Sequence, residues 1–292
     1  MVAPGDDDTP LADRLRGHVQ RLAGEIGERN VFRPEALHAA EVYLRDVWIR
    51  QGHAVADQEY LAAGVRSTNL EIRLAGRSAG ESIVIGAHYD TVTHSPGADD
   101  NASAVAVLLE LGRLLGDVRL GCELRLVAFV NEESPFFFTQ RQGSRVYARA
   151  ARQQGDRIRW MLSLEMLGYY RDTPGSQRYP PLFRWFYPDT ADFIALVSNF
   201  RSRHEMRRLA TAFREASDFP LERAATFSWI PGVAWSDHLS FWREGYRAMM
   251  LTDTAFFRNP HYHAATDTPD TLDYGRMAAV AEGLAAALAQ LS

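Results

Sequence analysis

The sequence contains no lysine, only one cysteine (Cys122) and no apolar run long enough to span a membrane. Every basic residue is Arg or His, which by itself indicates no function. A single cysteine excludes an internal disulfide and fits a reducing compartment, so we expect a cytoplasmic protein. The net charge of −5 gives no support to nucleic-acid binding, which requires a basic surface. We therefore expect neither a membrane nor a nucleic acid as a partner.

The amino-terminal residues 1–10 are acidic, and they lack both the basic region and the apolar core of a secretory signal. We expect this stretch to be flexible. The chain as a whole has an ordinary composition for a globular protein, with 46% apolar and 24% charged residues over its 292 residues. That length allows one large domain, and no linker or repeat divides it. We therefore predict a single domain over residues 1–292.

The chain is organised around residues 83–115. Residues 83–87 form a short, β-branched apolar run, typical of a strand buried on both faces of a parallel sheet. The run stops at His88, and a polar loop with several aspartates follows. A helical pattern begins near Ala102. Because open α/β sheets bind ligands at the carboxyl ends of their strands, this loop is a candidate site.

The same arrangement of an apolar strand with a polar end recurs further along the chain. Residues 123–130 lead into Asn131-Glu132-Glu133, and residues 159–164 end at Glu165. A last strand over 247–251 leads to a polar loop that contains His261 and His263. The repetition predicts that these side chains meet at one edge of the sheet.

The other elements complete an α/β fold. We predict further strands at 53–60, 69–74 and 193–197, and helices at 11–26, 34–51, 204–216 and 273–291. The first two of these strands, joined at Ala63-Gly64, form an antiparallel hairpin at the sheet edge. Together these elements predict a three-layer α/β/α sandwich with a mostly parallel mixed sheet and helices on both faces. Residues 169–192 are rich in Pro, Gly and aromatics and are either a substrate-side loop or a packed surface loop.

Five side chains at the predicted strand ends are metal-ligand types: His88, Asp99, Glu133, Glu165 and His263. Imidazole and carboxylate donors suit zinc. Five donors are more than one tetrahedral ion needs, but with one bridging carboxylate they can hold two ions. Each residue alone is a weak signal, whereas their joint occurrence at separate strand ends favours a metal site.

The motifs in this order resemble the M28 family of zinc aminopeptidases, of the bacterial leucyl-aminopeptidase type. The resemblance spans residues 83–270 and is carried by six segments: HYD at 88–90, GADDNAS at 97–103, NEE at 131–133, LEMLG at 164–168, SDH at 236–238 and HAATDT at 263–268. It implies a zinc-peptidase fold and two zinc ions per chain. It also implies that His88, Glu133, Glu165 and His263 are terminal ligands and that Asp99 bridges the ions.

The resemblance further implies two catalytic roles. Glu132 would be the general base. Asp90 would orient His88 by binding the imidazole nitrogen that does not face the metal, as metal-bound imidazoles require. Many family members have Asp at the position of Glu165, which keeps the ligand type. His261 competes with His263 as a ligand, and the spacing to Asp267 favours His263 by resemblance.

The implied reaction is hydrolysis of the first peptide bond of a substrate with a free amino terminus. The aromatic residues of 136–138 and 169–170 would line an apolar side-chain pocket. We expect Phe137, Tyr169 and Tyr262 to contact substrate. Asp237 and His238 either contact substrate or cap the helix that follows.

Three alternatives remain at this stage. A glutaminyl cyclase would keep a similar metal site, although Tyr262 stands where such enzymes commonly carry Trp. An inactive peptidase-fold domain could serve binding alone, but it would not need a complete set of ligands and a general base. A carboxypeptidase would need an arginine for the terminal carboxylate, and the candidates near the motifs are Arg141, Arg171 and Arg178.

Overall fold

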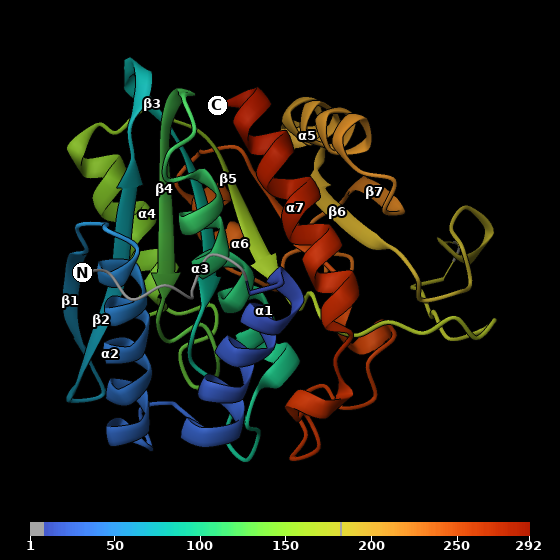
Figure 1. The fold of residues 1–292 in the computed structure, drawn as a ribbon, viewed down its shortest axis with the longest axis horizontal. Coiled ribbons are helices and arrows are strands. Elements are labelled where there is room, and N and C mark those ends of the chain that lie inside the picture. The colour runs from blue at the N-terminus through green and yellow to red at the C-terminus, as the bar shows by residue number, and fades with distance from the viewer. Residues whose placement is uncertain (1–8, 182) are drawn as a thin grey trace.

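The computed structural model describes residues 9–181 and 183–292. Its centre is an eight-stranded sheet with the strand order β1-β2-β4-β3-β5-β8-β6-β7 (Figure 1). The strands are β1 Ala56–Ala62, β2 Val65–Leu74, β3 Gly76–His88, β4 Leu120–Phe129, β5 Ile158–Glu165, β6 Ile194–Asn199, β7 Leu221–Thr226 and β8 Ala248–Thr252.

The four central strands β4, β3, β5 and β8 run parallel to one another. The hairpin of β1 and β2 joins antiparallel to β4, and β6 joins antiparallel to β8. The edge strand β7 runs parallel to β6. This is the mostly parallel mixed sheet that the sequence predicts, and the edge hairpin turns at the predicted Ala63-Gly64.

Helices cover both faces of the sheet. The helices are α1 Leu11–Val19, α2 Pro34–Arg50, α3 Ala104–Leu115, α4 Gly143–Gln154, α5 Arg203–Ala216, α6 His238–Arg243 and α7 Tyr274–Leu291. Five of them, α1, α2, α3, α5 and α7, lie on one face, whereas α4 and α6 pack together on the other (Figure 1). The three predicted layers are therefore present.

Each face of the sheet buries its own apolar core. On β3, Ile83 and Ile85 point into the larger core beneath α3 and α7, whereas Val84 points into the smaller core beneath α4. Alternate residues of a strand face opposite sides, so a strand buried on both sides must be apolar throughout. The continuous apolar run of residues 83–87 satisfies this requirement.

The sequence analysis missed two elements, α4 and β7. The buried face of α4 consists largely of small residues, including Gly143, Ser144 and Ala148, so the segment offers few large apolar side chains that would mark a helix. The β7 strand carries two charged residues near its start and lies at the sheet edge, where one side is free of neighbours. The predicted helix at 11–26 is α-helical only as far as Val19, and it continues as a π-helical segment, Gln20–Ile26.

Some predictions about the chain as a whole stay predictions. The expected flexibility of residues 1–10 concerns a stretch of which residues 1–8 lie outside the described residues. The single-domain assignment is likewise untested. Within the described ranges, no helix combines the length and apolarity needed to cross a bilayer.

Candidate metal centre

The polar side chains predicted at the strand ends meet at one edge of the sheet. His88 is the last residue of β3, Glu165 is the last residue of β5, and Glu133 follows β4 closely. Asp100 comes from the segment between β3 and α3, and His263 comes from the loop after β8. Parallel strands place their carboxyl ends together, which is why residues far apart in sequence meet here.

The imidazoles and carboxylates lie at short distances from one another. His88 Nε2 is 3.3 Å from Asp100 Oδ1 and 3.6 Å from Glu165 Oε1. His263 Nε2 is 3.1 Å from Asp100 Oδ2 and 3.2 Å from Glu133 Oε1. One oxygen of Asp100 therefore faces each histidine. The other competitor, His261, pairs its Nδ1 with Thr266 Oγ1 instead.

The structure corrects one predicted ligand, because the aspartate in the cluster is Asp100 and not Asp99. The Asp99 carboxylate accepts hydrogen bonds from the Gly168 N–H at 2.9 Å and from Asn259 Nδ2 at 2.6 Å. The segment Ala98–Ser103 leaves helical geometry at Asp100 and Asn101. Sequence spacing therefore could not show which of two consecutive carboxylates turns toward the histidines.

Two further aspartates hold the backbone of the cluster. Asp90 accepts hydrogen bonds from the N–H groups of Glu132 and Glu133, at 3.0 and 3.1 Å. Asp267 accepts from the N–H groups of Asp99 and Asp100, at 2.9 and 3.1 Å. Asp90 Oδ1 also lies 3.6 Å from His88 Nδ1, on the side expected of a residue that orients this imidazole. The sequence analysis gave Asp267 no role beyond spacing.

The backbone after β5 is held by side chains from the segment that carries Asp100. The N–H of Met166 donates to Asn101 Oδ1 and the N–H of Leu167 donates to Ser103 Oγ, both at 2.9 Å. With the bond from Gly168 to Asp99, three consecutive amides are bound. Glu165 immediately precedes them, so its position is set by these hydrogen bonds. In the sequence, only the GADDNAS motif indicated that this segment supports the site.

A buried guanidinium supports the loop between His88 and Asp100. Arg29 is fully buried and donates hydrogen bonds to backbone carbonyls of Tyr89, Pro96 and Gly97, at 2.7 to 3.0 Å. Burial lowers the pKa of Arg29 to about 10, against the attraction of Asp90 and other nearby carboxylates. The sequence analysis did not identify Arg29, because a lone arginine after a helix carries no recognisable signal.

The charge of the site is strongly negative, and this shifts the pKa values of its groups. Burial raises the pKa of Glu133 to about 7, and the neighbouring Asp100 contributes to the rise. Burial also raises the pKa of Glu132 well above its usual range. Burial opposes the charge of His263, but hydrogen bonds to Asp100 and Glu133 outweigh it and raise its pKa to about 10.

The donor set fits divalent metal ions. Three groups of His, Asp and Glu share members and offer ligand atoms within 4.8 Å of one another: His88 with Asp100 and Glu165, His88 with Glu132 and Glu133, and Asp100 with Glu133 and His263. Two donors of one tetrahedral zinc lie about 3.3 Å apart, which matches the imidazole-to-carboxylate distances of 3.1 to 3.6 Å. Asp100 Oδ1 is buried and accepts no hydrogen bond from the described residues, so this oxygen can bind a cation.

The predicted general base lies beside the cluster. Glu132 is buried and belongs to one of the three groups, with His88 and Glu133. Its Oε1 is 3.4 Å from Gln142 Nε2, the one hydrogen bond that its side chain makes to the described residues. A carboxylate so placed can accept a proton from a molecule bound at the cluster.

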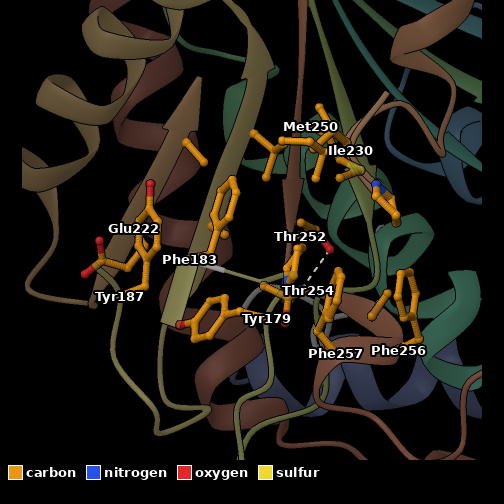
Figure 2. Close-up of a pocket in the computed structure, with 18 of the residues that line it drawn as sticks. Tyr179, Phe183, Tyr187, Glu222, Ile230, Met250, Thr252, Thr254, Phe256 and Phe257 are labelled. Atoms are coloured by element: carbon orange, nitrogen blue, oxygen red, sulfur yellow. Dashed lines mark hydrogen bonds between the residues drawn. The ribbon is translucent and has the colours of Figure 1, made fainter. Parts of the chain in front are cut away.

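An apolar cavity of about 110 Å³ adjoins the cluster through Glu165 and Tyr262. Figure 2 shows other residues that line this cavity. Tyr179, Phe183 and Tyr187 from the predicted substrate-side loop form part of its wall. The opposite wall comes from the segments before α6 and after β8, including Ile230, Trp235, Phe256 and Phe257. The loop at 169–192 thus lies against a cavity next to the candidate site.

The predicted substrate contacts differ in their positions. Tyr262 lines the cavity and stacks on His263, with ring centroids 3.8 Å apart. Tyr169 and Phe137 are not among the cavity residues that the structure describes, because Tyr169 packs against His261 and Phe137 against Phe138. The prediction that these two contact substrate gains no support from the geometry.

Asp237 and His238 are both fully buried beneath the site. His238 Nε2 is 2.8 Å from the Val233 carbonyl, and burial lowers the pKa of this histidine to about 4. Asp237 occupies the N-cap position of α6, but its side chain makes no capping hydrogen bond, and neither carboxylate oxygen has a hydrogen-bond partner among the described residues. Burial raises its pKa to about 7. Neither residue lines the described cavity, and Asp237 stands at the start of α6 without a side-chain capping bond.

The fold and this donor set are those of a metal-dependent hydrolase, and comparison with known proteins narrows the class. A family model described as "Peptidase family M28" matches residues 69–288. This match covers most of the chain, so the chain belongs to peptidase family M28, as the motifs predict. It is therefore a metallopeptidase of the exopeptidase type.

Relatives by sequence agree with this assignment. The protein of Escherichia coli (strain K12) described as "Uncharacterized protein YfbL" is 38% identical over 281 residues, covering 93% of this chain and 86% of that protein. A "Probable leucine aminopeptidase" of Arthroderma otae is 27% identical over 228 residues, 72% of this chain. The match spans only 54% of that fungal protein.

Solved structures share the fold. A zinc aminopeptidase from Bacillus subtilis has a TM-score of 0.73 at 15% identity, with 97% of this chain and 95% of that chain covered. A glutaminyl cyclase from Fimbriiglobus ruber has a TM-score of 0.74 at 20% identity, with coverage of 98% and 97%. At these identities the likeness concerns the fold alone, and both activities occur on it.

Proposed function

We propose that this protein is a di-zinc aminopeptidase that removes apolar amino-terminal residues from peptides. The observation that carries the proposal is the position of Asp100, which presents one carboxylate oxygen to His88 and the other to His263. A carboxylate between two imidazoles is the arrangement that a bridging ligand requires. Glu165 would be a further ligand on the His88 side of Asp100, and Glu133 would be one on the His263 side.

When bound, two zinc ions would supply a water that ionises near neutral pH and would polarise the scissile carbonyl. Glu132 would accept the proton of the attacking water and deliver it to the leaving amine. Asp90 would hold the backbone of Glu132 and Glu133 while it orients His88, so that base and ligand keep a constant separation.

The charges of the site support attack at the amino end of a peptide. A free α-ammonium group is stabilised by the negative potential of the buried carboxylates. A carboxypeptidase would need a guanidinium beside the metal ligands. Arg141, Arg171 and Arg178 are exposed, and none of them is among the described cavity residues. Arg223 does line the cavity, but it lies next to Glu222 on the edge strand β7, three strands away from Glu165 on β5. Tyr262 and the apolar cavity beside Glu165 support an apolar side chain at the first position.

The experiment compares substrates that differ only at the amino terminus. The zinc-loaded protein should release the fluorophore from Leu-, Met- and Phe-aminomethylcoumarin, and N-acetylated versions should give no release. Glutaminyl-aminomethylcoumarin, analysed by mass spectrometry, separates hydrolysis from cyclisation, because only cyclisation produces a pyroglutamyl product. Comparable turnover of acetylated peptides, or a pyroglutamyl product as the main one, would reject the proposal.

The matched control uses the protein's own site. The zinc-loaded Glu132→Gln variant keeps the shape and the metal ligands, so it should leave all these substrates nearly intact. Release that persists unchanged in this variant would come from a contaminating peptidase rather than from the site.

A further inference from the structure

The cavity beside the metal centre follows one row of residues across the sheet. Glu165 on β5 is in register with Thr252 on β8, and Thr252 is in register with Ala195 on β6. Ala195 is in register with Glu222 on the edge strand β7. All four line the cavity. Residues in register point to the same face of a sheet, so a carboxylate lies at each end of this row and two short side chains lie between them.

The walls of the cavity are apolar along this row. Met250 and Val197 line the floor beside it, and Phe183, Ile230 and Phe257 line the walls. Figure 2 shows Glu222 and Tyr187 at one end of the pocket, with Ile230 and Phe256 toward the other. The cavity is therefore an apolar passage with a carboxylate at each end, and Arg223 also lines it, next to Glu222.

The far carboxylate has no partner among the residues that the structure describes. Glu222 is half-buried, and it forms no ion pair or hydrogen bond with any residue in the described ranges. The rings of Tyr179 and Tyr187 stack beside it, with centroids 5.9 Å apart. Their hydroxyls donate to the backbone carbonyls of Pro188 and Arg223. An unpaired carboxylate next to aromatic rings attracts a cation, because both the charge and the ring faces are negative.

The length of the row fits one class of side chain. Three strand spacings of about 4.8 Å separate the Cα atoms of Glu165 and Glu222 by ~14 Å. In an extended lysine, six bonds of about 1.5 Å separate the α-nitrogen from Nζ by ~7 Å along the zigzag. With a hydrogen bond of ~2.9 Å at each end, the two ammonium groups can reach carboxylates ~13 Å apart. A leucine side chain ends well before Glu222.

We infer that Glu222 makes this site accept an amino-terminal lysine or arginine in addition to apolar residues. The methylene stem would lie along Thr252 and Ala195, and the cationic group would pair with Glu222 beside Tyr187. This inference rests on the proposed aminopeptidase function, because the α-amine must be held at the Glu165 end. Glu222 is thus a residue that determines specificity, at a distance from the reacting atoms.

The experiment measures kcat and KM for Lys-, Arg-, Leu- and norleucine-aminomethylcoumarin. Norleucine has the shape of lysine without its charge. Glu222→Gln should lower kcat/KM for Lys and Arg about tenfold or more, mainly through KM, because a charge-assisted hydrogen bond is lost. Leu and norleucine should stay within about twofold of the original protein, since their contacts are unchanged. Glu282→Gln, which removes an exposed carboxylate on α7, should change none of these values.

A second variant tests the sign of the interaction. Glu222→Arg should reduce cleavage of Lys- and Arg-substrates more strongly than Glu222→Gln, because like charges then face each other. Equal losses for lysine and norleucine in either variant, or an unchanged preference for lysine, would overturn the inference. If the original protein releases leucine but shows no effect of Glu222, only this inference fails. If it releases no residue from any free-amine substrate, the proposed function fails as well.

Discussion

The carboxylate of Asp90 accepts a hydrogen bond from the backbone N–H of Glu133 at 3.1 Å, and its other oxygen binds the N–H of the preceding residue at 3.0 Å. Asp267 repeats this arrangement on the other side of the cluster with Asp99 and Asp100. Each aspartate thus fixes a pair of consecutive acidic residues through their amides. These hydrogen bonds go to backbone N–H groups. They therefore fix the directions of the four carboxylates without using the oxygens of those carboxylates.

We predict that Asp90→Asn weakens zinc binding about 10–100-fold, the usual effect of removing a group that orients a metal ligand. The amide keeps one acceptor oxygen but turns an NH₂ group toward a backbone N–H. Competition with a chromophoric chelator measures the affinity, and amide exchange at residues 132–133 reports the local backbone. Unchanged affinity with faster exchange would show that Asp90 supports the fold alone.

The pair Asp99 and Asp100 gives the sharpest test of the metal centre. Asp100→Asn should reduce the zinc content after dialysis from about two ions per chain to one or fewer, because a bridging ligand serves both ions. Asp99→Asn is the matched control and should retain about two ions, since the Asp99 carboxylate binds Gly168 and Asn259 instead. Elemental analysis decides between them. Equal zinc loss in both variants would contradict the assignment of Asp100.

The neighbouring residues Glu132 and Glu133 should separate catalysis from metal binding. Glu132→Gln should keep its zinc and lose ~10²–10⁴ in kcat, the typical contribution of a general base. Glu133→Gln should lose zinc affinity, because its Oε1 lies 3.2 Å from His263 Nε2 in the cluster. Zinc content and kcat measured on the same preparations test both statements. Two variants with the same metal loss would make Glu132 a ligand.

Acid stability should depend on Glu110, far from the metal centre. This buried carboxylate accepts hydrogen bonds from Arg14 and Arg113, at 3.0 and 2.6 Å, and a His18 nitrogen lies 3.0 Å away. Burial opposes its ionisation, but these partners outweigh burial and lower its pKa to about 2. An unfolded glutamate has a pKa of ~4.3. The ionised group therefore stabilises the fold above pH ~4, and this contribution disappears as the pH falls through about 2.

We expect Glu110→Gln to lower the free energy of unfolding by ~1–2 kcal/mol at pH 7, and the difference from the original protein should vanish near pH 2. Urea unfolding of both proteins without metal, in the presence of a chelator, avoids any contribution from acid release of zinc. The exposed Glu282→Gln is a suitable control, and it should change the free energy little at either pH. A difference that stays constant between pH 7 and pH 2 would contradict the prediction.

The parallel centre of the sheet and its polar edge could be predicted from local patterns, whereas the strand order could not. The run over residues 83–87 indicated a strand buried on both faces, and β3 has Ile83 and Val84 in separate cores. The acidic residues after β4 and β5 indicated a shared edge, because parallel strands end together. Two elements without large apolar side chains to mark them were missed: α4 buries mostly small residues, and β7 carries charges at the sheet edge.

The sequence by itself determined which residue types would meet at the edge of the sheet, because each apolar strand is followed directly by its polar residues. Only the tertiary structure decided which individual atoms face one another. Asp99 and Asp100 are indistinguishable by spacing, and their directions depend on the irregular backbone of Ala98–Ser103 and on Asp267, far along the chain. Glu165 and Glu222 share a row only because two intervening strands bring them into register. Hydrophobic periodicity is local and can be read along the chain, whereas register and side-chain direction arise from contacts between distant segments.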